Sequence, residues 1–274
     1  MVEASPPPSP ARATQLPATW PECYNWCVFT PRTSLSLAGI TEPVATAASP
    51  RALIEWAATL GYKAVHLDAA LPGIRPRELD RSARRDLASL LRRLQLDFSG
   101  VDLWVPPAHF LDPAQQDRAV SAVVGALELA SELARLLSGT PILSTALPDK
   151  ITSGLLDSLR AAADLHGCTL ADHAWPSHGS EGPLAIGVDP AELLAARLDP
   201  AAEVSRLAAI PAAARLSDYA NAGRVTPGKG QLDVLAYQVA LATKGYRGFT
   251  VVDLRRVRNQ ADAAKQVLEA SSPR

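Results

Sequence analysis

The chain has 274 residues, of which 47% are hydrophobic, so it can bury a sizeable core in one large domain or two small ones. Its formal net charge is −1 and no segment is a basic block, which argues against a nucleic-acid-binding protein. Three cysteines, an odd number, imply no disulfide framework and favour a reducing compartment. We therefore expect a cytoplasmic protein that does not bind nucleic acid.

The first 22 residues are rich in proline, alanine and serine and poor in large aliphatic side chains. Such a segment cannot bury enough apolar surface to offset the entropy of ordering, so residues 1–22 are predicted to be a disordered leader. The leader lacks the apolar centre of a signal peptide, and no later segment has the 18 or more apolar residues of a membrane helix. Residues 23–274 are predicted to form one domain that does not associate with membranes.

Short β-type segments alternate with longer helical ones along this domain. The predicted strands are 24–30, 63–68, 97–105, 140–147, 168–174, 184–189, 213–219 and 249–253. The predicted helices are 51–61, 81–94, 114–137, 151–167, 232–246 and 260–270. This order indicates parallel strands joined by crossover helices, and eight strands fit a closed (β/α)8 barrel better than an open sheet. No glycine-rich phosphate loop follows the first strand, which weakens the dinucleotide-binding alternative.

In a (β/α)8 barrel the functional groups lie at the carboxyl ends of the strands, where the loops meet. The polar residues predicted there are Asp68, Asp102 or His109, Asp172, His173, Asp189, Arg215, Asp218 and Asp253. Structural roles are open for each of them. Asp189 precedes Pro190 and has the character of a helix N-cap. Asp253 could pair with Arg255 or Arg256 at the rim.

Aromatic side chains near the strand ends have two interpretations as well. Trp104 could stack on the face of a sugar or pack against the loop that follows its strand. His109 lies in the proline-rich segment WVPPAHFLDP, where it could line the mouth or only belong to the loop.

Three stretches resemble the xylose-isomerase-like barrels, a superfamily of sugar phosphate isomerases and epimerases that also contains endonuclease-IV-type enzymes. They are LGYKAVHLD (60–68), DPAELLAARLDP (189–200) and RLSDYANAGRVTPGKGQLDVLAYQVALATKGYRGFTVVD (215–253). The last has a strand ending in Asp, a Pro-Gly-x-Gly turn, an Asp before a helix and a final strand ending in an acid. The resemblance covers roughly residues 50–270 and implies the barrel fold.

The resemblance also implies a metal site. Active members hold one divalent metal with a Glu, an Asp, a His and a final Glu at different strand ends. By this likeness the ligands here would be Asp172 or His173, then Asp189, and finally Asp253, for Mn²⁺, Mg²⁺ or Zn²⁺. Arg215 replaces the family's histidine, and a guanidinium has no lone pair to offer a metal. Either Arg215 points away from the site, or its charge has taken the place of the metal.

The implied reaction is an isomerisation or epimerisation of a small carbohydrate through an ene-diolate. Asp172 and Asp253 would be the acid/base groups, His173 a proton shuttle and Arg215 an oxyanion stabiliser. Asp68, Trp104, His109 and Asp218 would contact the substrate. A barrel that binds a sugar-like ligand or a partner without catalysis is the main alternative. A metal-dependent phosphodiesterase of the endonuclease type is a third, which needs more histidine ligands and a basic groove.

Overall fold

The structure is a computed structural model that describes residue 1, residues 32–41 and residues 49–271. Eight parallel strands form a closed barrel in the order β1-β10-β7-β6-β5-β4-β3-β2. The strands are β1 (Thr33–Ser36), β2 (Ala64–Asp68), β3 (Asp97–Asp102), β4 (Ile142–Thr145), β5 (Thr169–Asp172), β6 (Leu184–Val188), β7 (Ala213–Leu216) and β10 (Thr250–Val252). The predicted (β/α)8 fold is therefore confirmed.

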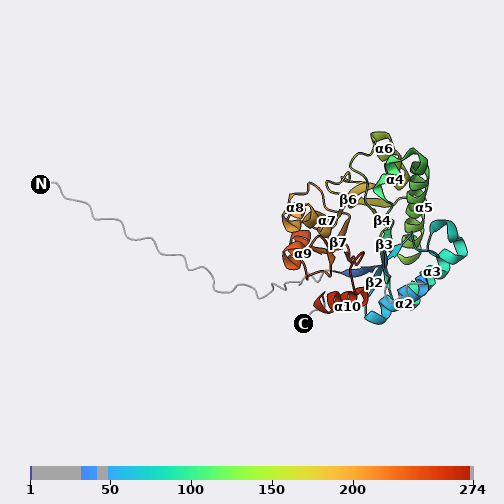
Figure 1. The fold of residues 1–274 in the computed structure, drawn as a ribbon, viewed down its shortest axis with the longest axis horizontal. Coiled ribbons are helices and arrows are strands. Elements are labelled where there is room, and N and C mark those ends of the chain that lie inside the picture. The colour runs from blue at the N-terminus through green and yellow to red at the C-terminus, as the bar shows by residue number, and fades with distance from the viewer. Residues whose placement is uncertain (2–31, 42–48, 272–274) are drawn as a thin grey trace.

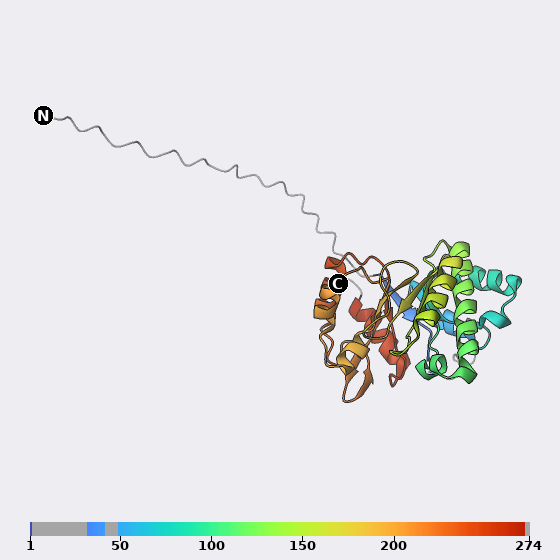
Figure 2. The same ribbon diagram turned by 90° about the horizontal axis from the view of Figure 1, so that it is seen from above.

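Helices surround the strands, as Figure 1 shows. They are α2 (Pro50–Leu60), α3 (Arg81–Arg93), α4 (Pro107–Leu111), α5 (Pro113–Leu137), α6 (Ser153–Leu165), α7 (Pro190–Ala195), α8 (Pro200–Arg206), α9 (Val234–Thr243) and α10 (Gln260–Ser271), with a 3-10 turn at Pro76–Glu78. The view from above in Figure 2 shows the long α5, in green, lying along one side of the barrel. Among the described residues, no helix is both long enough and apolar enough to cross a lipid bilayer.

The predicted strands from 63–68 onward all coincide with strands of the barrel. The first predicted strand, 24–30, lies outside the described residues, as do residues 2–22 of the predicted leader. The strand that opens the barrel is β1, to which no predicted strand corresponds. Its alternate residues Ser34 and Ser36 are buried and bond to polar side chains of β3, so β1 lacks the apolar alternation that reveals a strand.

Two short helices, α7 and α8, fill the interval between β6 and β7, where the sequence indicates a helix beginning at Asp189 without fixing its extent. Each begins with the pair Asp-Pro, and Asp189 and Asp199 accept hydrogen bonds from the backbone N–H groups of Ala191 and Ala201. The aspartate satisfies a free N–H of the first turn, and proline suits the first helical position. The N-cap role predicted for Asp189 is confirmed.

Helix α2 illustrates how the outer layer is held. Leu53, Ile54 and Ala57 recur at helical spacing, and all three are buried against the barrel. Burying side chains such as Leu53 and Ile54 stabilises the fold by about 2 kcal/mol each. Gly61 ends the helix with a φ of 103°, the left-handed geometry that glycine adopts without strain.

The interior of the barrel is polar, in contrast to the branched aliphatic layers that usually fill such barrels. Its strands contribute the buried side chains of Ser34, Ser36, His66, Ser99, Asp102, Ser144 and Arg215. Gly100 lies at an irregularity in the β2–β3 pairing, and a Cβ there would come within 2.5 Å of the His66 ring. The barrel thus carries hydrogen-bonded polar groups beneath the strand ends where a functional site is expected.

Candidate functional site

An ion pair between Arg215 and Asp102 spans the barrel. Arg215 lies on β7 and Asp102 on β3, which are opposite each other in the ring of strands. Both side chains are fully buried, and both terminal nitrogens of the guanidinium donate to the carboxylate. Ser36 adds a donated hydrogen bond of 2.6 Å from its hydroxyl. Arg215 is therefore neutralised within the barrel.

A second layer of charge lies at the carboxyl ends of the strands. We call Asp189, Asp253, Arg224 and Arg255 the mouth cluster. Asp189 follows β6 and Asp253 follows β10, the two neighbours of β7. Arg224 comes from a hairpin of β8 (Asp218–Ala220) and β9 (Gly223–Val225), and Arg255 follows the last strand.

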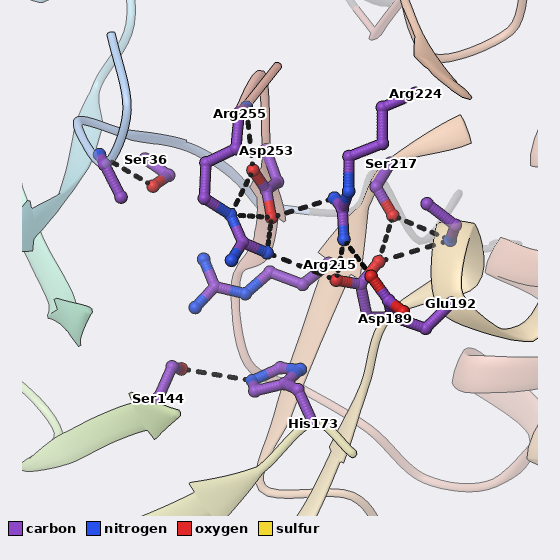
Figure 3. A network of polar contacts seen from close by, with 12 residues as sticks. Ser36, Ser144, His173, Asp189, Glu192, Arg215, Ser217, Arg224, Asp253 and Arg255 are labelled. Carbon is purple, nitrogen blue, oxygen red and sulfur yellow. Dashed lines mark hydrogen bonds and ion pairs between the residues drawn. The ribbon is translucent and has the colours of Figure 1, made fainter. Parts of the chain in front are cut away.

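Each arginine of the mouth cluster contacts both carboxylates (Figure 3). The Nη2 of Arg224 lies 2.6 Å from Asp189 Oδ2, and its Nη1 lies 3.3 Å from Asp253 Oδ2. The Nη2 of Arg255 lies 2.5 Å from Asp253 Oδ2 and 3.3 Å from Asp189 Oδ2. The two guanidinium groups thus occupy the place between the acids. Of the two partners that the sequence leaves open for Asp253, Arg255 and Arg256, the structure shows Arg255.

The mouth cluster fixes the ionisation of its members. Burial by itself raises the pKa of Asp189 and of Asp253, but the two arginines hold both pKa values below the usual range. Burial opposes the charge on Arg224 and Arg255 too, and the paired acids raise their pKa values nonetheless. At neutral pH the cluster holds two positive and two negative charges. Its carboxylates are weak proton acceptors, because an efficient general base has a pKa near the working pH.

His173 and Trp104 lie beside the arginines. The Nε2 of His173 is 3.2 Å from the hydroxyl of Ser144, and burial lowers its pKa well below the usual value, so the ring is neutral. The guanidinium carbon of Arg255 lies 3.5 Å from the centroid of the Trp104 ring, whose edge contacts His173 at 5.6 Å between centroids. Trp104 Nε1 and His173 Nδ1 are buried and have no hydrogen-bond partner within the described residues. Buried polar atoms of this kind call for an explanation, because nearly all find a partner.

Asp172 and Asp218 organise loops. The carboxylate of Asp172 accepts the backbone N–H groups of Leu147, Ala174 and His178, together with a bond from the His178 ring. The carboxylate of Asp218 accepts four backbone N–H groups, from Tyr219, Gly228, Gly230 and Leu232. The Pro-Gly-x-Gly turn noted in the sequence is therefore wrapped around Asp218, and neither carboxylate is paired with the mouth cluster.

Asp68 and His109 have different environments. Asp68 ends β2 and is buried, with 8% of its surface exposed to solvent. Its carboxylate accepts one hydrogen bond, from the backbone N–H of Ala70. Burial raises its pKa to about 6, against the opposing effect of that bond. His109 is exposed on the short helix α4, and no hydrogen bond or ion pair of the described residues joins it to the mouth cluster.

The donor groups do not fit a divalent metal. The structure brings Asp189 and Asp253 together, but Asp172 is held by its loop and His173 bonds to Ser144. Within residues 32–41 and 49–271 no group of three or more His, Cys, Asp or Glu side chains could hold a metal ion. A guanidinium about 4 Å from a divalent ion would repel it by roughly 8 kcal/mol at an effective dielectric of 20. Here two of them are paired with the acids.

The sequence leaves two possibilities for Arg215: it points away from the site, or its charge takes the place of a metal. In the structure Arg215 is paired with Asp102 inside the barrel, and the cations paired with Asp189 and Asp253 are Arg224 and Arg255. Arg224 lies in ANAGRV, between the strand end and the Pro-Gly-x-Gly turn, and no spacing rule points it at Asp189. Only the fold of the β8–β9 hairpin returns it to the strand ends. The feature of the sequence that could have indicated Arg224 is that it is the one charged residue in this short segment of small and apolar residues.

No protein-family profile matches the sequence, and no curated protein matches it either. Solved structures do. A xylose isomerase domain protein from Planctomyces limnophilus is similar with a TM-score of 0.63 and 15% identity, over 88% of this chain and 96% of the other. The IolI protein, solved with a zinc atom, has a TM-score of 0.58 and 14% identity, over 88% and 96%.

A sugar phosphate isomerase/epimerase from Parabacteroides distasonis has a TM-score of 0.58 and 12% identity, over 89% of this chain and 95% of the other. Each likeness spans nearly the whole partner at low identity, which establishes shared architecture and leaves the chemistry to be argued from the site. The resemblance noted in the sequence is confirmed: this chain has the fold of the xylose-isomerase-like sugar phosphate isomerase/epimerase barrels.

Proposed function

We propose that this protein is a barrel that binds a small carbohydrate ligand at its mouth and does so without a divalent metal. The observation that carries the proposal is the position of Arg224 and Arg255, whose guanidinium groups lie between Asp189 and Asp253. By the resemblance to the xylose-isomerase-like barrels, Asp189 and Asp253 stand at positions that hold a metal in active members. Here two fixed cations supply the positive charge that would meet ligand oxygens.

The side chains around the mouth cluster suit a polyhydroxylated ligand. Hydroxyl groups both donate and accept hydrogen bonds, so they match a site that offers carboxylates and guanidinium donors together. Trp104 supplies an apolar ring with a polar edge, the combination that packs against a sugar face. The buried Trp104 Nε1 and His173 Nδ1 add polar atoms that the protein itself does not satisfy. Fixed, mutually paired side chains also bind with little loss of conformational entropy.

The ligand class draws support from the structural neighbours, one of which is described as a sugar phosphate isomerase/epimerase. A cytoplasmic location fits such a protein and stays a prediction. The substrate-contact role predicted for Asp218 is less well supported than that of Trp104, because the Asp218 carboxylate is bonded to four backbone groups.

Calorimetric titration of the purified protein with a panel of aldoses, ketoses and polyols tests the proposal, with and without EDTA. We expect saturable binding of at least one of these compounds, with the same affinity in EDTA. Trp104→Leu should weaken that binding at least tenfold, while Leu165→Ala, an exposed control at the end of α6, leaves it unchanged. Stoichiometric Mn²⁺ or Zn²⁺ in the protein, with binding lost in EDTA, would contradict the proposal.

A second candidate, an isomerase or epimerase that transfers a proton without a metal, is favoured by Asp68. Its carboxyl ends β2 and has a pKa of about 6, which suits a general base at neutral pH better than the acids of the mouth cluster. In the isomerase case Asp68 would take the proton from the hydroxyl-bearing carbon beside a carbonyl, which leaves an ene-diolate, and return it to the former carbonyl carbon. The hydroxyl proton would pass to the former carbonyl oxygen, so that the carbonyl moves to the neighbouring carbon. Arg255 would stabilise the oxyanion between the two steps.

Deuterium exchange separates the two candidates. An isomerase incorporates deuterium from D2O at the carbon beside the carbonyl, with a rate that rises through pH 6, and Asp68→Asn abolishes the exchange while keeping ligand binding. A binding protein gives saturable titration and no exchange above the buffer rate.

A further inference from the structure

A cavity of about 800 Å³ lies beside the mouth cluster. Its walls are α7, the β8–β9 hairpin and the segment 256–258 that follows Arg255. Arg224 is the residue common to the cavity and the mouth cluster: it lines the cavity, and its guanidinium reaches Asp189 and Glu192. The cavity is thus a neighbouring space that shares Arg224 with the mouth cluster.

The charge of this cavity is strongly positive. Three arginines line it, Arg224, Arg256 and Arg258, and Glu192 is its only acidic residue. Arg224 is nine-tenths buried, and its guanidinium is already paired with the carboxylates of Asp189, Glu192 and Asp253. Arg256 and Arg258 are exposed, and their side chains have no hydrogen-bond or ion-pair partner in the part of the chain that the structure describes. Two guanidinium groups are therefore available to a ligand.

The backbone around the cavity is held in unusual conformations. Asn221 and Ala222 at the hairpin tip have φ values of 50° and 61°, and Arg256 has a φ of 62°. Residues 221 and 222 form the two-residue turn of the β8–β9 hairpin, a geometry that requires a positive φ at both positions. The turn thereby fixes the hairpin that forms one wall of the cavity, and Arg256 belongs to another wall. Tyr219 and Asn221 add neutral hydrogen-bonding groups to the lining.

We infer that this cavity binds an oxyanion, a phosphate or carboxylate group of a small molecule. The planar guanidinium matches both groups, because its parallel N–H bonds meet two oxygens at once. The volume far exceeds that of a single phosphate, so the anion would be one end of a larger ligand. Glu192, which also lines the cavity and is paired with Arg224 at 2.9 Å, opposes the anion and lowers its affinity. This inference concerns a site separate from the mouth and does not depend on carbohydrate binding there.

Titration calorimetry with inorganic phosphate, and in parallel with malonate, tests the inference in the absence of any carbohydrate. We expect saturable one-to-one binding, with the tighter of the two probes identifying the anion class. The double variant Arg256→Gln/Arg258→Gln should weaken binding by about tenfold, the equivalent of roughly 1.4 kcal/mol. Glu192→Gln should strengthen it by a few fold, because it removes the one opposing charge of the lining.

Arg81→Gln/Arg85→Gln provides the matched control, since both arginines are exposed on α3 and far along the chain from the cavity. It removes the same net charge and should change the affinity by less than a factor of about two. Equal weakening in the control and the cavity variant, or no saturable binding of either probe, would overturn the inference. Neither result bears on carbohydrate binding at the mouth, which is measured separately.

Discussion

The two oxygens of the Asp189 carboxylate serve different partners, and Arg224 is the partner of only one of them. Oδ1 accepts the backbone N–H of Ala191, which caps α7, and the hydroxyl of Ser217 at 2.5 Å. Oδ2 lies 2.6 Å from the Nη2 of Arg224. A single side chain thus begins a helix and holds a guanidinium at the barrel mouth. The structural and the functional interpretations of Asp189 are compatible.

Arg224→Met tests the strength of this pairing. The substitution keeps much of the side-chain volume and leaves Asp189 and Asp253 to share one buried cation, Arg255. Removing one partner of a buried pair costs about 3 kcal/mol or more, because a desolvated charge loses its compensation. We expect urea denaturation to show a loss of that order in the free energy of unfolding.

A double-mutant cycle identifies the cause of that loss. Asp189→Asn keeps an oxygen for the cap, since asparagine caps about as well as aspartate, and removes the charge that faces Arg224. Combined with Arg224→Met it should cost clearly less than the sum of the two single variants. Arg206→Met, which breaks an exposed pair with Glu203, should cost less than about 1 kcal/mol. Additive losses in the cycle would mean that Arg224 and Asp189 stabilise the protein independently.

The sequence predicted the barrel well because helical segments separate most of the strands from β2 onward, with a loop alone between β5 and β6. The strand-end positions of Asp68, Asp189 and Asp253 follow directly from that rhythm. Strand β1 escaped prediction because its inward residues are Ser34 and Ser36, whose partners Ser99 and Asp102 come from a strand about 65 residues later. Ser34 and Ser36 are buried because the closed barrel places them beside the polar side chains of β3, and the sequence of β1 alone does not indicate this.

The partners of the strand-end acids were harder to predict than their positions. Asp172 and Asp218 have the residue type and place of functional groups, yet backbone N–H groups of the following loops satisfy them. The spacing of residues in the sequence does not predict those loop conformations. Arg224 reaches Asp189 because a two-residue turn folds β9 back on β8, a contact that depends on three-dimensional structure alone.

Asp68 is predicted to destabilise the folded protein at neutral pH. Its pKa is about 6 in the folded state, above the value near 3.9 of an unfolded aspartate, so the folded state holds the proton more tightly. Stability is therefore greatest below about pH 4 with respect to this group and is lost as the pH rises through 6. Asp68→Asn should increase the free energy of unfolding at pH 7.5 by up to about 3 kcal/mol.

The pH dependence provides the control for Asp68. The gain from Asp68→Asn should shrink as the pH falls and vanish near pH 4, because the wild-type carboxyl is then neutral in both states. Asp80 is exposed and caps α3, so Asp80→Asn should change stability little at any pH in this range. A constant gain across the range would point to packing and not to a buried charge. Such a destabilising group at a barrel mouth is typical of a functional site.

His66 should make the protein less stable in weak acid. Burial lowers the pKa of His66 to about 4, with Arg215 adding to the effect and Asp102 opposing it. An unfolded histidine has a pKa near 6.5, so between that pH and about 4 the unfolded state binds a proton that the folded state does not bind. The stability contribution is complete above about pH 6.5 and is lost as the pH falls toward 4.

The size of the His66 effect can be measured by a difference. Between pH 7.5 and pH 5 the loss is about 2 kcal/mol for this group. Urea denaturation of wild type and His66→Asn over that range should show a shallower decline in the variant, whatever its absolute stability. His109→Asn, an exposed control, should keep the wild-type slope. Parallel slopes in wild type and His66→Asn would show that His66 titrates alike in both states.

Gly187 is predicted to be essential for the position of His173. The two residues lie on neighbouring strand ends, and a Cβ at position 187 would come within 2.6 Å of the imidazole ring. Gly187→Ala therefore forces the ring away from Ser144 and Trp104, and overpacking of this kind costs about 1–3 kcal/mol. In a His173→Ala background the three atoms nearest to that Cβ are gone, so the same substitution should cost much less. Ligand binding at the mouth should weaken in Gly187→Ala even when urea denaturation shows a folded protein. Equal costs in the two backgrounds would mean that the clash is with the backbone and not with His173.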